Sequence, residues 1–174
     1  MTADAISQQL CVTCGLCCNG VIFRDVELRA SDDLARLKTL GLPIKKTGKK
    51  IRFAQPCAAL ECSLCKIYAE RPSYCREFEC VLLRSTIEGN TEPAAALRII
   101  RTTQKRAAKV IRLLRELGDE NEHLSLSKRF KQVTKQFDTG HLTGESAGVY
   151  GDLTIAVHEL NLILSSAFYP GSES

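Results

Sequence analysis

Tryptophan is absent from this 174-residue sequence, methionine occurs once, and aromatic residues make up only 6% of it. No apolar run approaches the roughly 18 residues that a membrane-spanning helix needs, so we expect no membrane association. The first ten residues, MTADAISQQL, lack the basic and apolar regions of a secretory signal peptide. We therefore expect a cytoplasmic protein, which decides how its cysteines are interpreted.

Cysteine is the residue that the sequence has in excess, with nine copies in two groups and none beyond residue 80. The first group is Cys11, Cys14, Cys17 and Cys18, and the second is Cys57, Cys62, Cys65, Cys75 and Cys80. In a reducing compartment such a set is more often metal-binding or catalytic than disulfide-bonded. Buried structural thiols are an ordinary alternative for one cysteine, but a weak one for four within eight residues.

The spacing of the first group favours metal ligation. Cys-x2-Cys lets one turn of backbone aim two sulfurs at one metal, and it occurs in structural zinc sites and in cluster-binding ferredoxins. We therefore expect zinc or iron, including an iron–sulfur cluster, and eight sulfurs would fill two four-sulfur sites. Cys17 and Cys18 are adjacent, so they suit two different metals, or one ligand and one free thiol. We expect them to serve different metals or different irons, and the two groups to meet in space.

Two blocks of sequence carry a family resemblance. The run CVTCGLCC at 11–18 is followed by Cys57 with Ala58 and Leu60, and then by CKIYAERPSYCREF at 65–78. This pattern resembles the CxxCxxCC family of zinc- or iron-chelating domains over roughly residues 11–80. The chain departs from the family pattern at Ala69, which separates the tyrosine from the glutamate, and at Cys62, which is additional.

The resemblance implies a set of metal ligands. They are Cys11, Cys14, Cys17, Cys18, Cys57, Cys65, Cys75 and Cys80. Cys62 should be dispensable. A related cysteine motif occurs in flagellin lysine methylases, so the resemblance leaves an enzymatic role open.

Several side chains near the second group have two interpretations. Arg71 and Arg76 flank Cys75, where they would offset the negative charge of bound thiolates and donate hydrogen bonds to sulfur. Capture of a substrate carboxylate or phosphate is the alternative. Tyr68 and Phe78 are expected to pack around the site. The histidines all lie beyond residue 120, outside both cysteine groups, and are not expected to be ligands.

The first half predicts short elements. Residues 21–28 suit a strand, 31–41 suit a helix with Ser31 as its N-cap, and 43–56 suit a hairpin that turns at Thr47-Gly48. A turn of helix should follow Pro72. The expected core here is small, irregular and rich in cysteine.

The second half predicts a helical unit. Its expected helices cover 92–118, 125–140 and 151–168, after a junction at 80–91. We therefore predict an α+β fold with a cysteine-rich metal-binding domain at 1–90 and a mainly helical C-terminal extension at 91–174.

The helix over 98–115 carries seven lysines and arginines and no acid. A solvated helix face, offset by the acidic stretch at 118–122, is one interpretation. A surface for nucleic acid or for an acidic protein is the other. The formal net charge of +4 does not decide between them, because it counts every cysteine as a neutral thiol.

Three functional hypotheses follow from these patterns. The first is a metal-binding protein, the second is a metal- or iron–sulfur-dependent redox or protein-modifying enzyme, and the third is a metal-stabilised interaction module that uses the basic helix. No glycine-rich phosphate loop and no Cys-x3-Cys-x2-Cys motif is present, and no catalytic residue can be assigned.

Overall fold

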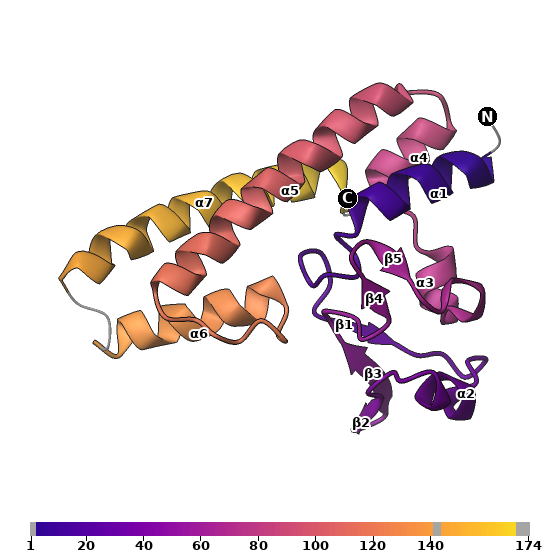
Figure 1. The fold of residues 1–174 in the computed structure, drawn as a ribbon, viewed down its shortest axis with the longest axis horizontal. Helices are drawn as coiled ribbons and strands as arrows, with labels where there is room; N and C mark the ends of the chain where they lie inside the picture. The colour runs from indigo at the N-terminus through magenta and orange to yellow at the C-terminus, as the bar shows by residue number, and fades with distance from the viewer. Residues whose placement is uncertain (1–2, 141–143, 170–174) are drawn as a thin grey trace.

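The structure is a computed structural model that describes residues 3–140 and 144–169. Figure 1 shows a cysteine-bearing part with short strands beside an elongated layer of helices. The first part comprises α1 (Ala3–Cys14), β1 (Asp25–Glu27), α2 (Leu34–Thr39), β2 (Lys45–Thr47), β3 (Lys50–Ala54), β4 (Leu60–Glu61), β5 (Leu64–Cys65), the 3-10 turn η1 (Tyr68–Glu70) and α3 (Ser73–Glu77). It is followed by α4 (Val81–Ile87), α5 (Pro93–Glu116), α6 (Leu126–Asp138) and α7 (Glu145–Ala167). The predicted α+β class with a mainly helical C-terminal part is confirmed.

The strands form two small antiparallel sheets, one in the order β1-β3-β2 and one of β4 and β5. The predicted hairpin is present, with Thr47 opposite Lys50. Gly48 turns it with φ of 61°, in the left-handed region that favours glycine. The strand predicted over 21–28 is the shorter β1, in which Val26 lies opposite Phe53. The hairpin sheet therefore presents Val26 and Phe53 to a core.

The N-cap predicted for the helix over 31–41 is wrong. Asp33 caps α2 instead, since its carboxylate accepts a hydrogen bond from the backbone N–H of Arg36 at 2.9 Å. The neighbouring Asp32 accepts from both the N–H and the hydroxyl of Ser73, each at 2.7 Å. This contact ties the chain before α2 to the start of α3, so the helix begins later than its sequence suggests.

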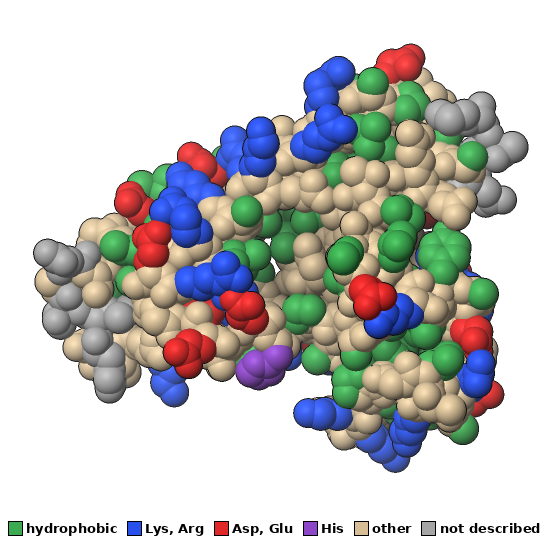
Figure 2. Space-filling model, viewed as in Figure 1, with side chains coloured by type: hydrophobic (Ala, Val, Ile, Leu, Met, Phe, Trp, Pro, Cys, Tyr) green, Lys and Arg blue, Asp and Glu red, His purple; other side chains and the backbone are tan. Residues whose placement is uncertain are grey.

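Other helix boundaries also differ from the expectation. The predicted junction at 80–91 contains α4, and α7 begins at Glu145 instead of 151. The turn of helix expected after Pro72 is α3, whereas α1 was not predicted. Lys and Arg side chains gather over α5 on the face that Figure 2 shows. No helix in the described ranges is long and apolar enough to cross a bilayer.

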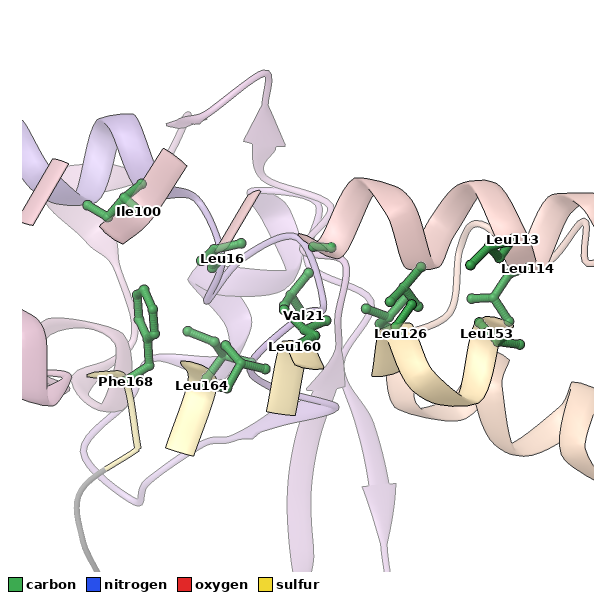
Figure 3. Close-up of a cluster of buried hydrophobic side chains, with 14 of the residues drawn as sticks. Leu16, Val21, Ile100, Leu113, Leu114, Leu126, Leu153, Leu160, Leu164 and Phe168 are labelled. Carbon is green, nitrogen blue, oxygen red and sulfur yellow. The ribbon is translucent and has the colours of Figure 1, made fainter. Parts of the chain in front are cut away.

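The larger hydrophobic core, which we call the helical cluster, lies where α5 packs along α7 (Figure 3). Ile100 and Leu114 of α5 and Leu164 of α7 are almost completely buried in it. Residues from before position 90 also belong to it, namely Leu10, Leu16, Val21, Ile22, Leu82 and Leu83. The division at residue 90 stays a prediction, but the helices beyond it share their core with α1 and the loop after it.

A second, smaller core lies under the three-stranded sheet, and we call it the strand cluster. Its buried members are Val26, Leu28, Leu37, Leu42, Phe53, Ala59 and Ile67. The cysteine-rich part thus packs against both cores. α1 and α4 pack against the helical cluster, and the strands and α3 pack against the strand cluster.

The two leucines at 162 and 164 of α7 provide a test of this packing. Leu164 is 2% exposed and Leu162 is 59% exposed. We expect Leu164→Ala to lower the free energy of unfolding by about 2–5 kcal/mol, because it leaves a cavity in the helical cluster. Leu162→Ala, the matched control, should change it by less than about 0.5 kcal/mol. Denaturant unfolding followed by circular dichroism measures both, and equal losses would contradict the assignment of the buried face.

Candidate metal centre

Eight of the nine cysteines line one cavity of about 500 Å³ between the two cores. They are Cys11, Cys14, Cys17, Cys18, Cys57, Cys65, Cys75 and Cys80. Cys62 is exposed and does not line the cavity. All nine are free thiols with no disulfide between them. The eight cysteines that the sequence proposes as ligands therefore converge, and the additional one stays outside.

The first group is positioned by the end of α1 and the turn after it. Cys11 and Cys14 are three residues apart on the helix, so they share a face. Gly15 then leaves the helix with φ of 62°, and its carbonyl accepts the N–H of Cys18 at 3.0 Å. Leu16, 1% exposed, holds this turn in the helical cluster. The turn therefore carries Cys17 and Cys18 to the same cavity.

A backbone hydrogen bond joins the two cysteine groups. The N–H of Cys57 donates to the carbonyl of Cys18 at 2.8 Å. Cys65 follows on β5, opposite Leu60 of β4, and Cys75 lies in α3. Cys80 is the N-cap of α4, where its Sγ accepts the N–H of Leu83 at 3.4 Å. These four cysteines of the second group are thus held by different local elements.

One set of thiols gathers around Cys17. Burial is the main cause that raises the pKa of Cys17, and the sulfurs that add to it are, in order, Cys14, Cys80, Cys18 and Cys11. Burial raises the pKa of Cys11 to about 11 and that of Cys14 to about 12, and Cys80 is the first sulfur that adds to each. Cys14, Cys17 and Cys80 also pack against the helical cluster. We call Cys11, Cys14, Cys17 and Cys80 the helical sulfur set.

The other thiols gather around Cys18. Burial raises its pKa to about 11, and Cys57 and Cys65 are the first sulfurs that add to the effect. Burial raises the pKa of Cys75 to about 12, with further contributions from Cys18, Cys57 and Cys65. Cys57, Cys65 and Cys75 also pack against the strand cluster. We call Cys18, Cys57, Cys65 and Cys75 the strand sulfur set.

Arg71 is the cation that faces both sulfur sets. Its guanidinium lowers the pKa of Cys11, Cys18 and Cys75, against the larger effect of burial. It lies 3.6 Å above the centre of the Tyr68 ring, and its Nε donates to the Tyr68 carbonyl at 3.0 Å. Tyr68 thereby holds the guanidinium in place, which is consistent with the expected packing role.

The second arginine of the motif points elsewhere. Arg76 also lines the cavity, but its Nη2 contacts the Ser73 hydroxyl at 3.5 Å, beside the Asp32 carboxylate. Phe78 packs edge-on against Phe23, with ring centres 4.8 Å apart. Of the two arginines, Arg71 is therefore the one that acts on the sulfurs.

Gln55 is a cavity residue that the sequence did not indicate. Its side chain is 2% exposed, and Oε1 is buried without a hydrogen-bond partner within the described ranges. Nothing in its sequence context separates it from an ordinary residue at the end of a strand. The histidines give no ligand to this cavity in the described ranges, because His123 and His158 are exposed and do not line it. His141 lies outside the described residues.

The arrangement brings the thiols together without closing them around a metal. Across residues 3–140 and 144–169, no three side chains of His, Cys, Asp or Glu are placed so that they could hold one metal ion. A tetrahedral zinc site, with Zn–S bonds of about 2.3 Å, needs sulfurs about 3.8 Å apart. The thiols of each set would therefore have to close in on a single ion.

The comparisons with known proteins give one result. The family model CxxCxxCC, described as "Putative zinc- or iron-chelating domain", matches residues 10–109. The match begins just before Cys11 and extends beyond the cysteines to Lys109 in α5, so it covers the end of α1 and all of α4 as well. No curated protein and no solved structure matches the chain.

Gly20 allows the cysteine turn to approach the helices closely. Its φ is 83°, and a Cβ there would lie 3.0 Å from Cα of Ser125 and 3.3 Å from the backbone N of Pro56. The carbonyl of Gly20 also accepts the N–H of Leu126 at 2.9 Å. The position therefore needs glycine for both its conformation and its contacts.

We expect Gly20→Ala to destabilise the protein by about 2–5 kcal/mol, since left-handed strain and overpacking add together. Gly15→Ala is the matched control: its φ is also positive, but a Cβ there would lie 3.7 Å from the nearest atom, Cβ of Ser63. Only strain of about 1–2 kcal/mol should result. Denaturant unfolding of both variants measures the difference, and equal losses would show that close approach at Gly20 is unimportant.

Proposed function

Because the chain belongs to the CxxCxxCC family of zinc- or iron-chelating domains, we propose that it binds zinc or iron in two four-sulfur sites. The helical sulfur set forms one site and the strand sulfur set forms the other. The observation that carries the proposal is the single cavity that collects eight cysteines and leaves out Cys62.

The donor set fits these metals. Thiolates are soft ligands that select zinc and iron–sulfur clusters over magnesium or calcium, and four of them complete a closed site. A zinc ion would act structurally, whereas a cluster would add electron transfer. In either case the chain supplies four sulfurs per site, and bound metal neutralises part of their charge.

The neighbours of Cys17 and Cys18 support their assignment to different sites. Cys14 is the sulfur that affects Cys17 most, and Cys57 is the one that affects Cys18 most. Cys17 also packs against the helical cluster, whereas Cys57 and Cys65, the sulfurs that affect Cys18 most, pack against the strand cluster. Consecutive residues would therefore link two metals through one peptide unit.

Arg71 would compensate the charge that both sites carry. Four thiolates around a dication leave a net charge of −2, and a guanidinium within electrostatic reach of both sets offsets part of it. Each site would also tie distant segments together: the helical site joins α1 to the start of α4, and the strand site joins the cysteine turn to β5 and α3. Structural zinc sites supply about 10–16 kcal/mol in this way.

Single and double Cys→Ser variants test both the function and the pairing. Cys17→Ser and Cys18→Ser should each reduce bound metal to about half, because each removes one ligand from one site. Cys17→Ser with Cys80→Ser should lose no more than Cys17→Ser alone. Cys17→Ser with Cys75→Ser should lose nearly all metal. Cys62→Ser is the control and should keep full loading.

The measurement is metal content by elemental analysis, with visible absorbance and acid-labile sulfide on anaerobically purified protein. Coloured protein with iron and sulfide identifies a cluster, and colourless protein with two zinc ions per chain identifies structural sites. Metal loss in Cys62→Ser together with full loading of Cys18→Ser would overturn the assignment.

The pKa values of the thiols predict a strong pH dependence of metal affinity. Seven of the eight have a pKa raised above the ordinary value of 9.0, so their thiols hold a proton at pH 7. Binding displaces these protons, and affinity must fall as the pH falls. Because even an ordinary thiol is almost fully protonated at pH 7, full loading of metal-free, reduced protein should release about one proton per ligating thiol, or about eight in all. Titration with zinc in a pH-stat counts them, and a release near zero would contradict ligation by these thiols.

A further inference from the structure

The outer face of α5 carries a line of positive charge that metal binding does not use. Seven lysines and arginines lie between Arg98 and Arg115, with no acid among them. Figure 2 shows blue Lys and Arg side chains gathered over α5. Five of them, at positions 98, 101, 105, 109 and 112, recur at three- and four-residue steps and therefore share one side of the helix.

Some of these cations have partners within the protein. Arg106 donates to the Glu159 carbonyl at 3.0 Å and lies 3.7 Å from its carboxylate. Arg112 bonds Glu116 at 2.6 Å, and Arg115 bonds Glu122. The C-terminal end of the face is thus neutralised by acids of the same chain.

Four cations keep no such partner, and we call them the basic ridge: Arg98, Arg101, Lys105 and Lys109. All four are exposed, and within the described ranges none of them forms an ion pair. They lie opposite the buried side of α5, which includes Ile100, Ala107 and Leu114. The ridge is therefore free of any role in packing the helix.

The arrangement has an electrostatic cost that an external anion would remove. Like charges at these spacings repel by about 0.2–0.5 kcal/mol per pair. The ridge spans about 16 Å along a rigid helix, with one cation every 4.5–6 Å. A nucleic-acid backbone offers a continuous line of phosphates on this scale, about one charge per 1.7 Å of duplex axis.

We propose that the basic ridge binds the phosphodiester backbone of a nucleic acid. Charge complementarity favours this partner over an acidic protein, whose carboxylates would have to match a straight line of four cations. A membrane surface is less suited, because no large apolar side chain of α5 is exposed beside the ridge to enter a bilayer.

Binding through the ridge is independent of base sequence. Gln104 is the one amide side chain of α5, and its Nε2 donates to the carbonyls of Thr13 and Cys14 at 2.8 and 3.0 Å. It is therefore occupied and cannot reach a base edge. The helix has no aromatic side chain on which a base could stack. Contacts to phosphates alone carry no sequence information.

The test uses the full chain in its metal-loaded form and fluorescence anisotropy with three labelled probes: a 20-base-pair DNA duplex, an RNA hairpin and poly-glutamate. We expect both nucleic acids to bind at low salt, with a slope of log affinity against log salt of about −3 to −4, as four phosphate contacts predict. Two DNA duplexes of different sequence should bind within about twofold of each other.

Two charge-reversed variants complete the experiment. Arg101→Glu with Lys105→Glu should weaken binding at least about tenfold. Lys131→Glu with Lys135→Glu makes the same change in net charge on exposed positions of α6 and should leave affinity within about twofold. Metal content and circular dichroism are measured on the same samples to show that both variants are folded and loaded. No binding to either nucleic acid at low salt, equal loss in both variants, or tighter binding to poly-glutamate would each overturn the proposal.

Discussion

The constraint on which the structure depends is that thiols from two separate stretches of chain must meet in one partly buried cavity. The hydrogen bond from the Cys57 N–H to the Cys18 carbonyl is where the two stretches join. Burial raises the pKa values of these thiols, so they are neutral at pH 7 until a metal cation binds the sulfurs and displaces their protons. The buried sulfurs therefore avoid an uncompensated negative charge in two states, as neutral thiols or as thiolates bound to metal. The two hydrophobic clusters form the walls of the cavity.

Much of the site could be predicted from cysteine spacing, because spacing within a turn fixes local direction. Cys17 and Cys18 are adjacent, and their side chains were expected to separate, as their different neighbours now indicate. The pairing of the second group could not be predicted in this way. Cys75 and Cys80 are only five residues apart, yet they belong to different sulfur sets because α3 packs on the strand cluster and α4 packs on α1. Such a division is decided by tertiary packing.

The elements that could be predicted are those with a strong local signal. The apolar period of α5 and the Thr47-Gly48 turn are of this kind. α1 was missed because its residues show little amphipathic pattern, and its stability comes from Leu10, 3% exposed, against α5. The cap of α2 was misplaced since Asp32 is engaged by Ser73, a contact across 41 residues that no local pattern contains.

The charge of the protein also depends on its metals, and this changes what its composition implies. Eight thiolates with two dications would bring the formal net charge from +4 to zero. A basic isoelectric point of 8.6 is then a property of the metal-free chain alone. Net charge would not attract a polyanion to the loaded protein, but the local distribution would, because the charge that the thiolates add lies in the cavity whereas the basic ridge lies on the outer side of α5. Exposed charges are screened beyond about 8–10 Å at physiological salt. The ridge would therefore attract a polyanion only at short range, whether or not metal is bound at the sulfur sites.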